Sequence, residues 1–312
     1  MKVYSDRSEI EKIKKAVVTV GSFDGFHRGH FKILETVKKI AAETDAASFV
    51  VTFDPHPRSV LAQNSEVGIL TSLEEKKWIV EEAGIENLMV IHFTREFSQQ
   101  TSEEFIRKFV VEKLNASHMV IGHDHKFGRD RLGDENKLRE IGNQFGFGVT
   151  AVSAECLDGE TISSTKVRNF LIAGELDKAN LFLGRLYSIC GIVVKGAQRG
   201  RTLGFPTANV QVDDPKKSIP KNGVYVVRCT LGSQNYYGVM NIGYRPTFEN
   251  KQEIVAEANI LEFNRDIYGE KIKVEFVKRL RDEKKFDSKD ALIHQIETDK
   301  KEAEKIASSK KI

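Results

Sequence analysis

Two histidines three residues apart are the first candidates for chemistry in this sequence. His27 and His30 stand in "GSFDGFHRGH", residues 21–30, directly after the apolar run 16–20. If that run is a buried strand and a helix begins near His27, both imidazoles lie in the first turn of the helix. Backbone N–H groups at a helix N-terminus attract phosphate, and imidazoles there can donate hydrogen bonds to charge that develops on a transferring group. The turn is therefore predicted to bind phosphate, and its further contacts are expected to be Gly21, Phe23, Asp24 and Gly29.

A second candidate phosphate-binding segment is "ISSTKVRNFL", residues 162–171. Its cations, Lys166 and Arg168, lie near the start of a predicted helix, and a guanidinium binds phosphate with two parallel hydrogen bonds. Arg168 is therefore the candidate catalytic cation of this segment. Taken alone, the segment also fits a capped helix with solvated bases. The hydroxyls expected to cap the helix and to contact ATP belong to Ser163, Ser164 and Thr165.

A glycine-spaced basic loop in "KGAQRGRTLGFPTANV", residues 195–210, indicates a separate site. Such a loop can wrap a polyphosphate, although it lacks the G-K-[ST] of a Walker A loop. Thr207 and Asn209 are two residues apart, so in an extended segment their side chains share one face, and their hard oxygen atoms suit Mg²⁺. A glycine-rich hairpin with surface bases is the alternative. The expected ATP contacts are Lys195, Gly196, Arg199, Gly200, Arg201, Gly204 and Pro206.

The elements that must position the first two segments alternate along the first half of the chain. Ile33, Leu34, Val37, Ile40 and Ala41 share one face of a predicted helix, and two capping boxes, Ser72 with Glu75 and Thr101 with Glu104, open further helices. Strands that alternate with helices indicate a mostly parallel sheet, whose ligands bind beyond the carboxyl ends of the strands. The apolar runs predicted to be strands are 16–20, 48–53, 88–93, 118–122 and 148–152.

The second half of the chain carries short, closely spaced β-rich runs, which favour an antiparallel barrel or sandwich. A last helix is predicted from about Ser288, with Leu292, Ile293 and Ile296 on its apolar face and a polar end that frays. The boundary is expected within 181–187, giving domains 1–184 and 185–312. The predicted strands are 186–194, 223–231, 236–242, 254–263 and 271–280.

Composition fits a two-domain globular protein. The 312 residues are 40% hydrophobic and 30% charged, and the net charge of +3 is too small to indicate nucleic-acid binding. Residues 186–312 carry 23 Lys and Arg against 17 Asp and Glu, a balance that suits an anionic ligand. Three scattered cysteines, with no signal peptide and no membrane-length apolar run, lead us to expect a reduced cytoplasmic protein. Small molecules are the expected partners, with no nucleic acid and no membrane, and the chain could be a monomer or a weak oligomer.

The histidine turn, residues 21–30, resembles the signature of the nucleotidyltransferase superfamily. Nearly the whole chain resembles the bacterial bifunctional riboflavin kinase/FMN adenylyltransferases, also called FAD synthetases. This resemblance implies a Rossmann-like N-terminal domain that adenylates FMN with ATP to give FAD and pyrophosphate. It also implies a C-terminal six-stranded antiparallel barrel that phosphorylates riboflavin with Mg²⁺ and ATP to give FMN. The segments that carry it are "VGSFDGFHRGH", "VTFDPHPRSVL", "IGHDHKFG", "ISSTKVRNFL", "GRTLGFPTANV", "NGVYVVRC", "NIGYRPTF" and "DIYGEKIKVEFVKRLRDEKKFDS".

The resemblance also implies residue roles. Glu257 aligns with the kinase base, a carboxylate that can take the proton of the attacking ribityl hydroxyl. Thr207 and Asn209 would hold Mg²⁺-ATP, and Arg281 would lie near flavin or ATP. The sequence departs from the family pattern at His125, where an aromatic is expected, and at Asn259, where His or Tyr is common. The flavin side of the first site would be lined by Phe53, Asp54, His56, Pro57, Asp124 and Phe127.

Three alternatives stay open. A nucleotidyltransferase for another phosphorylated acceptor would leave "GFPTAN" and Glu257 unexplained. An aminoacyl-tRNA synthetase shares a similar histidine motif, but this chain has no lysine-serine loop of the K-M-S-K-S kind. A flavin-binding regulator without turnover would have no use for the intact His27, His30 and Thr207.

Overall fold

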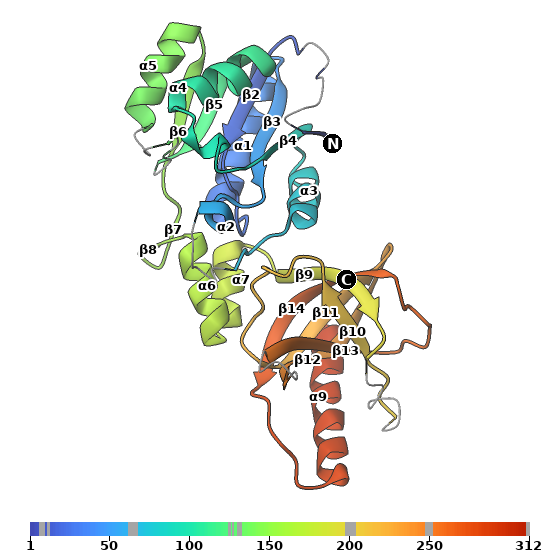
Figure 1. The fold of residues 1–312 in the computed structure, drawn as a ribbon. Coiled ribbons are helices and arrows are strands. Elements are labelled where there is room, and N and C mark those ends of the chain that lie inside the picture. The colour runs from blue at the N-terminus through green and yellow to red at the C-terminus, as the bar shows by residue number, and fades with distance from the viewer. Residues whose placement is uncertain are drawn as a thin grey trace. The chain divides into compact units, whose positions relative to one another are not determined.

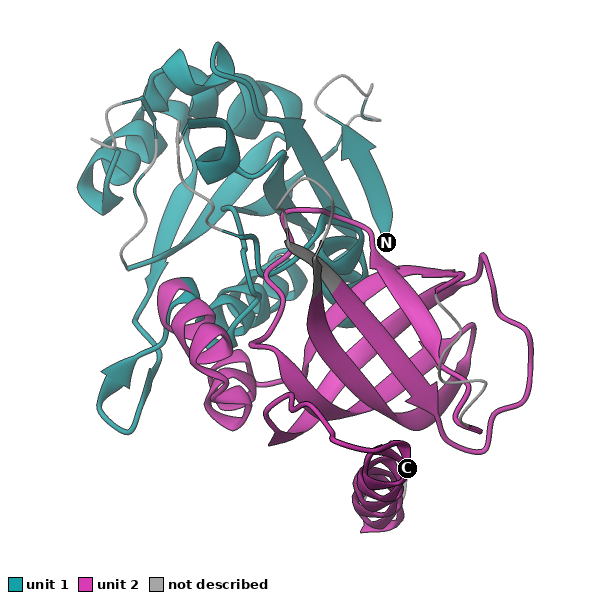
Figure 2. Ribbon diagram, turned by 60° about the horizontal axis from the view of Figure 1, so that its bottom comes forward, with its two compact units in different colours: residues 1–164 teal, residues 165–312 magenta. Residues whose placement is uncertain are grey.

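The computed structural model describes residues 1–5, 10, 13–61, 68–123, 126, 128–129, 133–196, 204–246 and 252–309. Backbone contacts divide the chain into two compact units, unit 1 (Met1–Ser164) and unit 2 (Thr165–Ile312), which are coloured separately in Figure 2. Figure 1 labels the helices and strands.

Unit 1 is built on a parallel sheet of six strands among the described residues, in the order β1-β4-β3-β2-β5-β6. The five apolar runs predicted to be strands are all confirmed. β1 was not predicted, because it is a four-residue edge strand with mostly exposed side chains. The strands are β1 (Lys2–Ser5), β2 (Ala16–Val20), β3 (Ala47–Asp54), β4 (Asn87–His92), β5 (Ala116–Gly122) and β6 (Gly148–Val152).

Helices cover both faces of this sheet because its strands are apolar on both sides. Val17, Val50 and Leu88 point to the face covered by α1 (Arg28–Glu43) and α3 (Leu73–Glu82). Val18, Val51 and Met89 point to the opposite face. That face is covered by α4 (Ser102–Phe105), its π-helical continuation η2 (Ile106–Lys113) and α5 (Glu135–Phe145). Three smaller elements are α2 (Pro57–Leu61), η1 (Phe97–Gln99) and the hairpin β7–β8 (Cys156–Leu157 and Glu160–Thr161).

Both predicted capping boxes are present. At the start of α3, Glu75 N donates to Ser72 Oγ, and Ser72 N donates to Glu75 Oε2 at 2.8 Å. Thr101 and Glu104 form the same reciprocal pair before α4. Because a lost N-cap costs about 1 kcal/mol, these side chains define where the two helices begin.

The strand order places one loop at the expected ligand position. From β2 the chain runs outward through β3 and β4, and it then returns to the other side of β2 to form β5 and β6. Ligands of open α/β sheets bind at the carboxyl edge where the order reverses in this way. Residues 21–27, which hold the first histidine, follow β2 at that point (Figure 1).

Unit 2 contains a closed antiparallel barrel of six strands within its described residues, in the order β10-β13-β12-β11-β14-β9. The sequence predicted five of these strands. It missed β10 because "ANVQV" is short and lies inside the glycine-rich segment. The strands are β9 (Tyr187–Val194), β10 (Ala208–Val212), β11 (Gly223–Leu231), β12 (Gln234–Pro246), β13 (Gln252–Ile260) and β14 (Lys271–Arg281).

The described residues of unit 2 include the helices α6, α7 and α9. α6 begins at Ser164 and ends at Ala173, and α7 spans Leu176–Leu183. They are bonded to the barrel, because Lys221 N donates to Leu171 O and Asn180 Nδ2 donates to Phe276 O. These bonds explain why residues 165–184, which the sequence analysis placed in the first domain, group with the barrel by contact.

The last helix, α9 (Lys289–Ser309), begins where predicted, and the predicted frayed end extends beyond the described residues. Its buried residues are Asp299 and Ala303, and the predicted apolar positions 292, 293 and 296 are half-buried. Ala303 packs with Val226 and Val277 on the outer face of the barrel. The helix is therefore held at its second half, where the sequence looks polar.

Candidate active sites

The turn after β2 is held in an unusual backbone conformation. Phe23 and Phe26 have φ angles of 45° and 43°, and Gly25 between them has a φ of 90°. A non-glycine residue in this left-handed region costs about 1–2 kcal/mol. The rings of Phe23 and Phe26 are buried, lie 5.4 Å apart and stand edge-on to His30. Their burial offsets the backbone strain, and Phe23 supports the His30 ring, while its contact with ATP stays a prediction.

The two histidines are brought together as predicted. Their rings stack with centroids 3.7 Å apart, and His27 is the N-cap residue of α1. The Nδ1 atom of His30 is buried and has no hydrogen-bond partner in the described part of the chain. Burial, followed by the nearby His27 and Lys76, holds the pKa of His30 well below 6.5. The His30 imidazole is therefore neutral at pH 7 and keeps one N–H for donation.

Asp24 ties the histidine turn to the start of α3. Its carboxylate is buried, and Oδ1 accepts from Leu70 N at 2.7 Å and from Thr71 N at 3.0 Å. Gly25 N in turn donates to Thr71 Oγ1 at 2.9 Å. Asp24 therefore braces the turn through Oδ1, while its contact with ATP stays a prediction.

The second phosphate-binding segment meets the turn at its first residue. Ser164 Oγ donates to Asp24 O at 2.7 Å, so α6 begins against the histidine turn. Ser163 is half-buried, Thr165 is exposed, and Arg168 is buried on α6. Gly21 and Gly29 flank the turn on either side. Gly21 N donates to Val51 O at 3.0 Å, which keeps the turn in register with β3.

The predicted flavin-side residues of "FDPHP" lie at the carboxyl end of β3, the strand next to β2. Phe53 packs in an aromatic group with Phe93, Phe97 and Phe105. Asp54 precedes a cis peptide bond, His56 is buried with its Nδ1 accepting from the backbone of α2, and Pro57 is the first residue of that helix. The other two predicted flavin contacts, Asp124 and Phe127, lie outside the described residues.

Lys76 of α3 was not singled out from the sequence, yet it lies beside the same site. Only 3% of this residue is exposed, and its Nζ donates to Thr52 Oγ1 and Phe53 O, both at 3.4 Å. Burial lowers the pKa of Lys76, while Asp24 and Asp54 act to raise it. A signal was present in the sequence, because Lys76 shares a helical face with the buried Ile79 and Val80.

In unit 2, strand register assembles the predicted kinase residues on the outer face of the barrel. Asn209 on β10 pairs with Glu257 on β13, and Glu257 pairs with Asn241 on β12. Residues directly opposite each other on neighbouring strands carry their side chains on the same side of the sheet. The adjacent row, Ala208, Ala258 and Met240, is buried in the barrel, so the row Asn209–Glu257–Asn241 faces outward.

The glycine-rich loop meets this row at Asn209. A Cβ atom built on Gly196 would lie 2.1 Å from Asn209 Nδ2, so glycine is required there for Asn209 to keep its place. Asn259, one of the departures from the family pattern, donates from Nδ2 to Pro206 O at 2.7 Å and fixes the backbone before Thr207. Lys195 is exposed over the ring of Tyr268, and Gly204 is exposed. The predicted Arg199, Gly200 and Arg201 lie outside the described residues.

Arg281 also lies on a barrel strand, but not beside Glu257. Its register partner is Val224 on β11, and its own strand, β14, is three strands from β13, the strand of Glu257, in the closed barrel. Its guanidinium forms a bidentate ion pair with the buried Asp299 of α9, with Nη2 to Oδ2 at 2.7 Å. Arg281 therefore fastens the last helix to the barrel.

The donors of unit 2 fit Mg²⁺ bound together with a nucleotide. The described residues contain no cluster of three or more His, Cys, Asp or Glu side chains that could hold a metal alone. Mg²⁺ keeps several waters and commonly takes one or two protein oxygens in addition to substrate phosphates. The half-buried Thr207 and Asn209 supply a hydroxyl and an amide oxygen next to Glu257.

Comparisons with known proteins assign a family to this architecture. A family model described as FAD synthetase matches residues 9–166, and one described as riboflavin kinase matches residues 183–307. The bifunctional riboflavin kinase/FMN adenylyltransferase of Bacillus subtilis strain 168 is 39% identical over 296 residues, which cover 94% of this chain and 93% of that protein. The chain belongs to the bifunctional riboflavin kinase/FMN adenylyltransferase family. The Escherichia coli K12 member is 36% identical over 284 residues, 91% of this chain and 90% of its own length.

One solved structure has the same fold as this chain. It is titled as a macrolide-efflux protein from Streptococcus pneumoniae, is 31% identical and covers 97% of this chain and 98% of its own, with a TM-score of 0.87. In the described part of this chain, no helix combines the length and apolar character needed to span a bilayer.

Proposed function

We propose that each unit carries one of the two activities named for the family. In unit 1, a phosphate oxygen of FMN attacks the α-phosphorus of ATP, and the bond to pyrophosphate breaks to leave FAD. In unit 2, the terminal ribityl hydroxyl of riboflavin attacks the γ-phosphorus of ATP, giving FMN and ADP. The observation that carries this division is that the FAD synthetase and riboflavin kinase matches fall on the parts of the chain that hold the histidine turn and the Asn209–Glu257 row.

In the adenylyl-transfer site, the paired imidazoles act on phosphate charge. A neutral His30 keeps one N–H for donation, and His27 stacks against it at the N-terminus of α1. Donors fixed in advance lower the barrier because they need no reorganisation when charge moves onto the leaving pyrophosphate. Ser163, Ser164 and Arg168 are proposed to supply further phosphate contacts, and "FDPHP" the flavin side.

In the kinase site, Glu257 is proposed to take the proton of the attacking hydroxyl. Its place beside Asn209 supports this role, because the base must lie near the γ-phosphorus of the bound nucleotide. Thr207 and Asn209 would hold Mg²⁺, which when bound screens phosphate charge. Lys195, Gly196 and Gly204, with the loop between them, are proposed to contact the polyphosphate.

One product analysis tests both assignments. Purified protein is incubated with riboflavin, ATP and Mg²⁺, and riboflavin, FMN and FAD are separated by chromatography over time. FMN should appear first and FAD later. FAD formed from added FMN but none from riboflavin would reject the kinase assignment, and FMN without FAD would reject the adenylyltransferase assignment. Binding of flavin with neither product would favour the regulator.

The domain boundary at 184/185 is proposed as the division of activities. It is supported by Gly184, which ends α7 with a φ of 74°, and by the start of the riboflavin kinase match at residue 183. The bonds of α6 and α7 to the barrel are a separate matter of stability: a fragment 165–312 should unfold at higher urea than a fragment 185–312. Equal urea midpoints for the two fragments would show that these bonds do not stabilise the barrel. A cytoplasmic location and a monomeric or weakly associated state also remain proposals, which cell fractionation and sedimentation would test.

A further inference from the structure

Lys76 is a buried cation that the proposed chemistry has not used. Among the described residues, no carboxylate oxygen lies within ion-pair distance of its Nζ, and its two hydrogen bonds, to Thr52 Oγ1 and Phe53 O, are both long. A charged group with such poor compensation destabilises a protein interior. An apolar residue would pack there at lower cost, since Lys76 shares its helical face with Ile79 and Val80. Retention of lysine points to a function for its charge.

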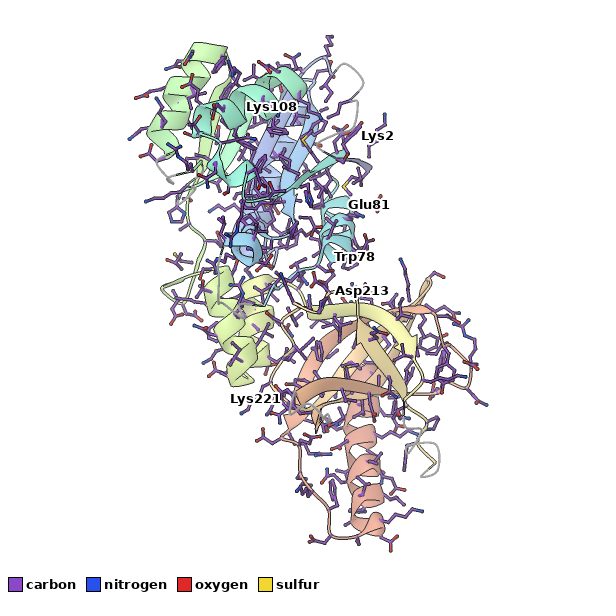
Figure 3. The ribbon with its side chains drawn as sticks, in the orientation of Figure 1. Lys2, Trp78, Glu81, Lys108, Asp213 and Lys221 are labelled. Carbon is purple, nitrogen blue, oxygen red and sulfur yellow. The ribbon has the colours of Figure 1, made fainter. Side chains whose placement is uncertain are left out.

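The surroundings of Lys76 connect it to the histidine turn. α3 starts directly after Leu70 and Thr71, the two residues whose N–H groups Asp24 binds. The Lys76 side chain then reaches the carboxyl end of β3, where Thr52 Oγ1 donates to Ser22 O of the turn. The opposite face of α3 is solvent-exposed and carries Trp78 and Glu81, both labelled in Figure 3.

We propose that Lys76 is a positioning residue for adenylyl transfer, a fixed positive charge behind the histidine turn that keeps His30 neutral while polyanionic substrates are bound. The inference rests on the proposed assignment of this reaction to the His27–His30 site. ATP and FMN both bring phosphate charge, which favours protonation of a nearby imidazole. The positive charge of Lys76 opposes protonation of His30. The imidazole therefore stays neutral and keeps one N–H for donation.

Charged and titratable groups surround both His30 and Lys76. His30 is influenced by His27 on α1 and by Lys76 on α3, both of which act to lower its pKa along with burial. Lys76 is influenced by Asp24 in the turn and Asp54 at the end of β3, which favour its cationic form. The two carboxylates therefore help keep the charge on Lys76, and Lys76 keeps it off His30.

The test compares Lys76→Met with Lys77→Met in the full-length protein. Lys77 is the matched control because it is the next residue of α3, is more exposed and pairs with Glu74 at the surface. FAD formation from FMN and ATP is measured from pH 5 to 9. FMN formation by unit 2 serves as an internal control of enzyme concentration, and Trp78 fluorescence reports whether unit 1 is folded. Lys76→Met should lower kcat for FAD formation about tenfold or more at pH 7. It should also move the acid limb of the profile to higher pH, because His30 then protonates more readily.

Lys76→Arg should keep the acid limb in its original place even where the larger side chain lowers the rate. The imidazole C–H signals of His30, followed by NMR, should give a raised pKa in Lys76→Met or, where that variant fails to fold, in Lys76→Gln. An unmoved His30 pKa, or a pH profile of Lys76→Met equal to that of Lys77→Met, overturns the proposed role of Lys76 but leaves the assignment of the site intact. Wild-type protein that makes FMN but no FAD rejects the site assignment and the role of Lys76 with it.

Discussion

Replacement of Asp24 by alanine is predicted to release the histidine turn from α3. The Asp24 carboxylate is 2% exposed and accepts the N–H groups of Leu70 and Thr71 at 2.7 and 3.0 Å. Alanine leaves both donors buried without an acceptor, at about 1–3 kcal/mol each, so unit 1 should lose roughly 2–6 kcal/mol of unfolding free energy. Asp24→Asn keeps an oxygen acceptor without the charge and should lose only about 1 kcal/mol per bond.

The single tryptophan of the chain makes this loss measurable in unit 1. Trp78 lies on α3, six residues after Ser72, and its fluorescence reports urea unfolding of this unit. Glu43→Ala, which removes an exposed carboxylate at the end of α1, is the control. FAD formation should fall in the order wild type, Asp24→Asn, Asp24→Ala, because His27 and His30 lose their fixed geometry, while FMN formation stays unchanged.

The reasoning fails if Asp24→Ala unfolds within about 0.5 kcal/mol of the Glu43→Ala control, since surface substitutions fall in that range. It also fails if FAD formation survives in a clearly destabilised Asp24→Ala protein, because the turn would then not need this brace.

Three further predictions concern single residues. His30→Ala should abolish FAD formation and spare FMN formation in the same chromatographic assay, and equal loss of both products would contradict two separate sites. Glu257→Gln should abolish FMN formation and spare FAD formation from added FMN, and a normal rate of FMN formation would remove Glu257 as the base. Asp299→Ala should leave the largely buried Arg281 guanidinium without its carboxylate and cost about 3 kcal/mol, read from urea unfolding of unit 2. Faster amide exchange along α9 should accompany that loss, and unchanged exchange would show that Arg281 does not hold the helix.

Much of unit 1 could be predicted because its signals are local. A run of four apolar residues and one threonine gave β2, and serine or threonine three residues before glutamate gave the starts of α3 and α4. The spacing of His27 and His30 placed both rings in one helical turn, which the 3.7 Å ring separation bears out. β1 and β10 were missed because "KVYS" and "ANVQV" contain no continuous apolar run. Their strand character depends on pairing with β4 and with β9.

The motifs identified candidate residues, but tertiary contacts determine the structural role of several of these residues. Asp24 belongs to the histidine motif, but only the proximity of residues 70–71 shows that its carboxylate is taken up in a brace. Arg281 lies in a matched segment, but Asp299 comes from a helix that no local pattern pairs with it.

The sequence alone determined the family and the order of the two domains, and it predicted the role of the histidine turn in phosphate binding, since each is written in contiguous residues. Tertiary structure decided which distant residues meet: Glu257 beside Asn209 through strand register, and Lys76 beneath the histidine turn through the packing of α3. The physical reason is that burial and electrostatic environment depend on neighbours from remote segments. The helical period indicates that Lys76 faces inward, but the groups near its charge come together only in the folded chain.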